Sequence, residues 1–252
     1  MELLWVALAS LFAGFVDAVV GGGGLILVPS LFAVFPQVHP ATLFGINKSA
    51  GIWGTGMAAL QFSRRVQVRW HAVAPGAAAA FIGAFGGAWA VTVVSADFLR
   101  KLLPFVLLLV LLYTLARKQL GRDHAPRLAG HIEAAAAAAI GLGLGFYDGF
   151  FGPGMGSFLV FAFVRVMGYD FVNASASAKL LNVASNLAAL ILFTLKGHVW
   201  WHYALALAVA NVAGSLMGTH LALKHGAGFV RGMFLLVVGA LILKTGYDAF
   251  LR

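Results

Sequence analysis

Apolar residues fill long stretches of the chain, and short polar clusters separate these stretches. Eight of them can be distinguished along the 252 residues, covering approximately 3–34, 42–62, 70–94, 102–116, 132–164, 173–195, 200–223 and 232–250. Most are long enough, as helices, to cross the roughly 30 Å of hydrocarbon in a bilayer. The pattern therefore predicts an all-α polytopic membrane protein.

Composition agrees with lipid as the solvent. Hydrophobic residues make up 62% of the chain and charged residues only 10%, with a mean hydropathy of +0.94. The net charge of +9 could suggest nucleic acid, but the basic residues lie at the ends of apolar stretches, as the positive-inside rule describes. We therefore expect the lipid bilayer as a partner and no nucleic acid.

The second half of the chain repeats the first at a fixed offset of 131 positions. The matches include unusual residues, among them an intramembrane Asp, a Lys and a Trp-His pair: Gly14, Phe15, Asp17, Lys48, Trp70, His71 and Arg100 correspond to Gly145, Phe146, Asp148, Lys179, Trp201, His202 and Arg231. We read this as a tandem duplication of a four-segment unit. The units are residues 1–116 and 132–252, joined by a connector over 117–131.

The first segment of each unit is interrupted by glycine. As one helix of 32 residues it would be roughly 48 Å long, which exceeds the bilayer. Residues 21–24 are all glycine, and residues 152–154 read Gly-Pro-Gly, so two half-helices joined at membrane depth are expected. Such a segment either crosses the membrane or returns as a re-entrant hairpin.

Charge in the loops does not separate these two topologies, because both place the same excess of Lys and Arg on the side of the connector. Segment length favours the hairpin. We therefore expect inverted repeats, with the 117–131 connector in the cytoplasm and both termini outside.

Two matched breaks predict a polar site in the middle of the membrane, because irregular backbone there must face protein or water. Half-helices that begin after the breaks would direct free N–H groups at an anion. The predicted backbone donors are Gly22, Gly23, Gly24 and Gly154. The alternative is that these glycines only allow helices to pack closely.

Polar side chains near the breaks suggest the same site. The predicted substrate-binding side chains are Asn47, Lys48, Lys179, Asn182 and Asn186. Both lysines lie about six residues inside apolar segments, where a buried ammonium needs partners. Alternatively, the long side chains could snorkel to the membrane surface.

Asp17 and Asp148 each precede a glycine break by four residues. They could carry a coupling proton, or they could pair with the lysines as permanent structure, and we favour the structural role. Glu133, at the start of a run of alanines, reads only as part of a helix-forming segment. Neither a metal-ligand spacing nor a catalytic or nucleotide-binding motif is present in the sequence, so we expect no cofactor, no metal and no enzyme activity.

Several motifs identify a resemblance to the TauE/SafE family over essentially the whole chain. They are Val16–Gly24, Gly145–Gly154, Gly45-Ile46-Asn47-Lys48 and Ala178–Asn186. The resemblance implies a permease of the cell inner membrane, with relatives linked to sulfite, sulfoacetate and other organosulfur anions. Ile46 and Met155 stand where such sequences often have threonine.

These observations predict a secondary transporter for a small anion, working by alternating access around a midplane site. A channel-like anion pore and a non-transporting membrane scaffold remain as alternatives. Self-association into a homo-oligomer is left open by the sequence.

Overall fold

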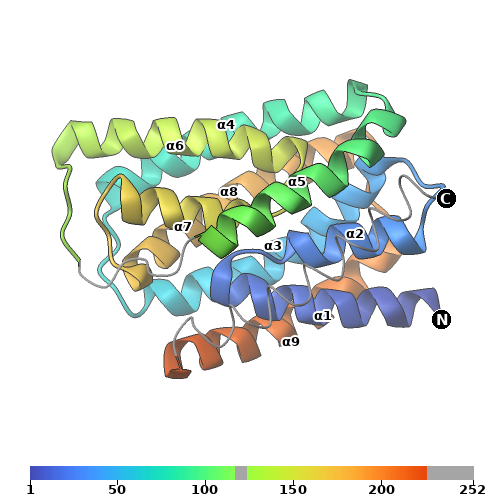
Figure 1. The fold of residues 1–252 in the computed structure, drawn as a ribbon, viewed down its shortest axis with the longest axis horizontal. Coiled ribbons are helices and arrows are strands. Elements are labelled where there is room, and N and C mark those ends of the chain that lie inside the picture. Colours follow the sequence, from blue (N-terminus) through green and yellow to red (C-terminus); the bar gives the residue numbers. More distant parts are fainter. Residues whose placement is uncertain (117–123, 226–252) are drawn as a thin grey trace.

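The computed structural model describes residues 1–116 and 124–225, and all regular structure within them is helical (Figure 1). The helices are α1 Glu2–Val20, α2 Gly24–Val34, α3 Pro40–Ser63, α4 Trp70–Val93, α5 Ala96–Ala116, α6 Gly130–Phe150, α7 Met155–Arg165, α8 Phe171–Leu195 and α9 Trp201–His225. The all-helical prediction is confirmed. Helix α5 begins six residues before the predicted 102, because it includes the polar turn with Asp97. The predicted segment 232–250 lies outside the described residues.

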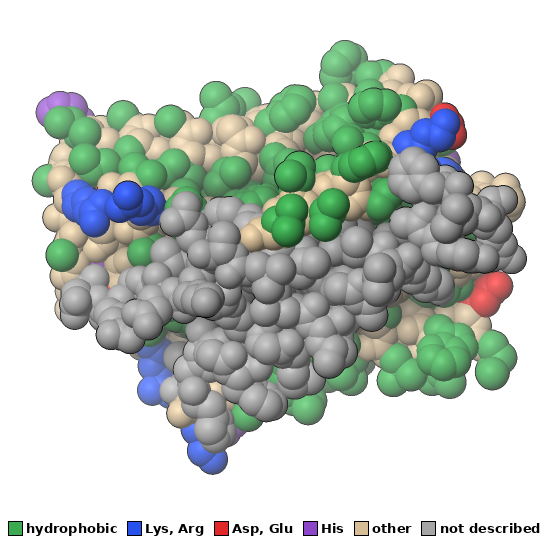
Figure 2. Space-filling model, viewed as in Figure 1, with side chains coloured by type: hydrophobic (Ala, Val, Ile, Leu, Met, Phe, Trp, Pro, Cys, Tyr) green, Lys and Arg blue, Asp and Glu red, His purple; other side chains and the backbone are tan. Residues whose placement is uncertain are grey.

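Four of the described helices are long and apolar enough to span a membrane: α1, α4, α8 and α9. Large hydrophobic side chains such as Ile82, Trp89 and Val209 are exposed along their outer faces. In Figure 2 hydrophobic side chains cover the visible face of the described part, and Lys and Arg gather toward its ends. A surface of this kind belongs in lipid.

The chain leaves the helical path at both glycine breaks. Gly21 ends α1 with a left-handed φ of 77°, and Gly152 and Gly154 follow α6 with φ values of 93° and 83°. Only glycine adopts such angles without strain. In Figure 1, α1 runs inward from the end that carries the N-terminus, and α2 returns toward that end.

Each half of the chain packs its first helix against the other half. Helix α1 lies along α9, and α6 lies along α4, while α3 and α8 contact each other between them. Glycines make the close approaches possible: Gly145 of α6 lies against the Ala80 backbone of α4, and Gly214 of α9 lies against the Leu11 backbone of α1. Small residues let helices pack backbone to backbone in a membrane.

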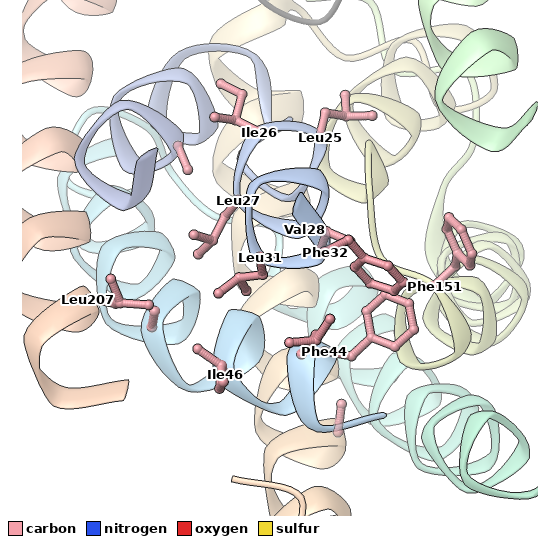
Figure 3. Close-up of a cluster of buried hydrophobic side chains, with 14 of the residues drawn as sticks. Leu25, Ile26, Leu27, Val28, Leu31, Phe32, Phe44, Ile46, Phe151 and Leu207 are labelled. Atoms are coloured by element: carbon pink, nitrogen blue, oxygen red, sulfur yellow. The ribbon is translucent and has the colours of Figure 1, made fainter. Parts of the chain in front are cut away.

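The short helix α2 is enclosed in the largest hydrophobic cluster. Leu25, Leu27 and Leu31 are fully buried. Figure 3 shows the rings of Phe32, Phe44 and Phe151 gathered beside it, and ring centroids of Phe44 lie 5.7 Å from those of both other residues. Packing on all sides fixes the half-helix in place, which a helix of 11 residues could not do by itself.

At one end of the molecule, Glu133 of α6 is fully buried. Its carboxylate accepts hydrogen bonds from Tyr169 (2.6 Å), contacts His71 Nε2 at 2.6 Å and pairs with Arg69 Nη2 at 3.0 Å. Burial and the bond to Glu133 raise the pKa of Tyr169, so its hydroxyl remains a donor. The sequence reading of Glu133 as part of a helix is confirmed, but it missed the burial of this carboxylate, because its three partners come from distant segments.

At the opposite end, the residues between α2 and α3 contact those between α8 and α9. The rings of His39 and His198 stack with centroids 5.5 Å apart, and Thr42 Oγ1 lies 3.0 Å from His198 Nδ1. Arg100 of α5 donates to the Val38 carbonyl there, at 2.6 Å. Burial lowers the pKa of His198, with His39 and Lys196 acting in the same direction.

The tight crossing of α4 and α6 makes a testable prediction. A Cβ added to Gly145 would lie 2.7 Å from the Ala80 Cα, whereas one added to Gly143 would meet nothing within 4 Å. We expect Gly145→Ala to destabilise the protein by about 1–3 kcal/mol through overpacking. Gly143→Ala, the matched control, should be neutral or slightly stabilising because alanine favours helix. Thermal unfolding in detergent measures both, and equal melting temperatures would contradict the described crossing.

Candidate functional site

A small buried cavity lies where the two breaks meet. Its volume is about 40 Å³, room for a few water molecules. Residues from both halves line it: Ala13, Asp17, Gly21, Gly23, Gly24, Leu27, Asn47, Lys48, Gly51, Thr55, Asp148, Gly152, Gly154, Met155, Gly156, Asn182, Asn186 and Asn211. The site therefore combines both glycine breaks with polar side chains of α3, α8 and α9.

The two breaks touch through their backbones. The N–H of Ser157 donates to the Gly21 carbonyl at 2.9 Å, and a Cβ on Gly21 would lie 2.6 Å from the Gly156 Cα. Only glycine on both sides allows this approach. The contact places the first residues of α2 and α7 on the cavity wall, where the positive ends of two helix dipoles meet.

Lys48 and Asp148 form a buried ion pair in the cavity wall. The Lys48 Nζ lies 2.6 Å from Asp148 Oδ1, and the two side chains are 3% and 2% exposed. The second carboxylate oxygen accepts a hydrogen bond from Ser185 of α8 at 2.6 Å. Because Lys48 comes from the first half and the other two residues from the second, this pair joins the halves.

Asp17 and Lys179 occupy the equivalent positions but interact differently. The Lys179 ammonium donates to the main-chain carbonyl of Asp17 at 2.9 Å and lies 5.2 Å from the Phe62 ring. The Asp17 carboxylate instead accepts from the Thr55 hydroxyl at 2.8 Å and from the Gly23 N–H at 3.3 Å. Lys179 thus stabilises the negative end of α1, as a cation at a helix C-terminus does.

Most of the predicted site residues come together here. The cavity wall contains nine of them: Asn47, Lys48, Asn182, Asn186, Gly23, Gly24, Gly154, Asp17 and Asp148. Lys179 and Gly22 are not part of its wall. Both lysines are buried, at 3% and 5% exposure, so the snorkelling alternative does not describe them. Substrate binding by the lining residues remains a prediction.

Asn211 of α9 also lines the cavity and was missed by the sequence reading. Its amide donates to the Ser10 carbonyl at 3.0 Å, which leaves its carbonyl oxygen directed at α3 beside Gly54. An asparagine inside the apolar stretch 200–223 was the available signal. It was overlooked because the position 131 residues earlier, Ala80, is apolar.

The charge of the cavity wall differs from the cationic pocket that the sequence suggested. One ammonium, that of Lys48, and two carboxylates, those of Asp17 and Asp148, line it. The reason is that Lys179 turns to the backbone of α1 and leaves the wall. Among the described residues, no cluster of His, Asp or Glu side chains is arranged to hold a metal ion.

Comparison with known proteins agrees with this architecture. The family described as "Sulfite exporter TauE/SafE" matches residues 6–245. "Probable membrane transporter protein YfcA" of Escherichia coli (strain K12) is 37% identical over 240 residues, which cover 95% of this chain and 88% of that protein. "Probable membrane transporter protein ORF9" of Sinorhizobium sp is 32% identical over 98% of this chain and 93% of its own.

A "Probable membrane transporter protein" of Haemophilus influenzae is also 32% identical, over 94% of this chain and 91% of its own length. No solved structure matches the chain. The family match spans nearly all of the sequence, from before the first break to beyond the last described helix. The chain therefore belongs to the sulfite exporter TauE/SafE family of membrane proteins.

Proposed function

We propose that this membrane transporter is a secondary carrier for small anions, with sulfite or an organosulfonate as substrate, and that it works by alternating access. The observation that carries the proposal is the buried cavity where the starts of α2 and α7 meet beside Lys48. The printed description of the family, a sulfite exporter, supports the substrate class.

Three kinds of group support an anion as the guest. Gly24 and Met155, the first residues of α2 and α7, line the cavity, so the positive dipole ends of both helices lie beside it. Lys48 supplies the ammonium, and Asn47, Asn182 and Asn186 supply amide groups. Ammonium and amide N–H groups are donors that an oxyanion accepts from, and the cavity of about 40 Å³ suits a small one.

The arrangement of the two halves supports inverted repeats. Residues 125 and 127 of the connector bond to residues 165–168 at the end that carries the Glu133 cluster. At the other end of the molecule, residues 39 and 42 contact residue 198. A re-entrant hairpin in each half predicts these two groupings, whereas crossing segments would place 198 beside the connector.

Inverted halves offer a route to alternating access, because rearrangement of one half against the other can open the central site to either side in turn. Different contacts lie at the two ends: the Glu133 cluster on the side of the connector, and the stacked His39 and His198 on the other. We place the protein in the cell inner membrane, with the connector in the cytoplasm and the termini outside.

The carrier proposal is tested by flux into proteoliposomes with a panel of sulfite, sulfoacetate, methanesulfonate and thiosulfate. We expect saturable uptake of at least one anion, and at least about tenfold less in the double variant Lys48→Gln/Asp148→Asn, which removes a charged donor. The double variant is used because Lys48→Gln alone leaves Asp148 as an unpaired buried charge, at a cost of about 3–5 kcal/mol.

The control is Lys101→Ala, which removes an exposed lysine whose ion-pair partner among the described residues is Asp97, in the preceding turn of the helix. Its uptake should match the wild type. Flux that never saturates and shows no exchange would favour a channel-like pore. Absence of flux for every anion, with the protein folded, would favour a non-transporting scaffold.

The topology is tested by single-cysteine labelling, which is straightforward because the chain contains no cysteine. Gln67→Cys and Val166→Cys should react with an impermeant reagent only from the cytoplasmic side. Gln37→Cys and Lys196→Cys should react only from outside. All four positions are exposed, and labelling of Gln67→Cys and Lys196→Cys from the same side would refute the inverted arrangement.

A further inference from the structure

The carboxylates on the cavity wall oppose the binding of an anion. With its side chains ionised, the wall has two carboxylates, Asp17 and Asp148, and one ammonium, Lys48. An anion entering this low-dielectric space would meet these two carboxylates, while the Lys179 ammonium lies behind the wall on the Asp17 main-chain carbonyl. Neutralising one carboxylate as the anion arrives favours binding.

An incoming anion would affect the two carboxylates differently, because Lys48 is paired with Asp148 and not with Asp17. Asp148 is 1% exposed, and its partners are the Lys48 ammonium at 2.6 Å and one hydroxyl, that of Ser185. Lys48 is also the only ammonium on the wall. An anion that binds Lys48 must therefore compete with Asp148 for it.

Asp17 is less affected by that competition, because it is not paired with Lys48. Its carboxylate is bonded by two neutral donors, the Thr55 hydroxyl and the Gly23 N–H, and no cationic side chain of the described residues forms an ion pair with it. Lys179 is held on the Asp17 main-chain carbonyl, away from the wall. The duplicated Lys and Asp positions have thus diverged into one exchangeable pair and one structural contact.

We propose that the anion enters together with one proton, that the anion takes over the Lys48 ammonium, and that Asp148 receives the proton. The proton comes from the same aqueous side as the anion and binds Oδ1, the oxygen that Lys48 releases, while Oδ2 keeps its hydrogen bond from Ser185. Lys48 stays charged throughout. Release on the other side reverses both steps, so each anion carries one proton with it. This inference rests on the proposed anion carrier and adds its coupling ion.

The surroundings of Asp148 leave few other groups to accept that proton. Lys48 of α3 is paired with it, Asp17 of α1 lines the same cavity, and Tyr147 precedes it on α6 with its hydroxyl donating to the Pro153 carbonyl. Lys179 of α8 is bound to the Asp17 main-chain carbonyl. On α4, the neighbours of this part of α6 are the small residues Ala84 and Gly87. The acidic group at the other end of α6, Glu133, is about 22 Å away along the helix.

Calorimetry on the purified full-length protein in detergent tests the proposal. An anion from the flux panel that the wild type binds is titrated into the protein in buffers of different ionisation enthalpy. The dependence of the binding enthalpy on the buffer gives the number of protons taken up per anion, after correction for the ionisation of the anion itself. We expect about one proton per anion in the wild type and an affinity that falls about tenfold per unit rise in pH while Asp148 is ionised in the empty site. Wild-type binding without proton uptake overturns the proposal.

Asp148→Asn and its matched control Asp17→Asn assign the proton. Asp148→Asn should bind the anion with no proton uptake and no dependence of affinity on pH, whereas Asp17→Asn, whatever its affinity, should still take up about one proton. Continued uptake in Asp148→Asn, or its loss in Asp17→Asn, contradicts the assignment.

A second variant covers the case in which Asp148→Asn does not fold. Ser185→Ala removes the one hydroxyl that donates to the ionised Asp148, so the carboxylate should accept the proton more readily and the pH at which affinity begins to fall should move upward. No shift overturns the assignment. If the folded wild type binds no anion at all, the proposed carrier function is wrong, and this inference fails with it; proton-free anion binding defeats the inference alone.

Discussion

The structure depends on how two stretches of non-helical backbone satisfy their polar groups inside a membrane. Lipid offers no hydrogen bonds there, so each break must find its partners in the protein or in a cavity that the protein encloses. The chain solves this by placing the breaks against each other, with the Gly21 carbonyl accepting from the Ser157 N–H and the Asp17 carboxylate accepting from the Gly23 N–H. Because the breaks must meet, the helices that carry them must enter from different parts of the fold and cross at one point. The cavity is the space that remains around this contact.

Much of this arrangement was readable from the sequence because it follows from rare residues at a fixed spacing. Glycine runs in the middle of overlong apolar stretches predicted the breaks between α1 and α2 and between α6 and α7, and the helix boundaries agree. Polar side chains at corresponding positions predicted that Lys48, Asp148 and the asparagines of α8 would lie near them, and the cavity wall contains them. Such residues predict a buried site because an ionisable group or a break in a helix is too unfavourable in lipid to occur without a partner.

The rest could not be read because it depends on which groups meet across the fold. The repeat makes Lys48 and Lys179 look equivalent, yet one faces a carboxylate and the other a main-chain carbonyl. The surroundings of the two aspartates also differ: Asp17 accepts from Thr55, whose counterpart 131 positions later is Asn186, whereas Asp148 accepts from Ser185. Glu133 gave no signal because its partners lie 62 to 64 positions before it and 36 after it. The hydropathy pattern predicts which residues are buried, but it does not predict which buried residues pair with each other.

The exchange of helices between the halves has a consequence for the origin of the fold. Glycines of α1 lie against the backbone of α9 and those of α6 against the backbone of α4, so within the described residues each entering helix is covered by a helix of the other half. If the halves arose by duplication, a single copy of the unit needed a second copy to cover its glycine face and to meet its glycine break. A dimer of identical subunits supplies both. Fusion of two such genes leaves each copy free to change separately, in keeping with the unequal contacts of the two lysines.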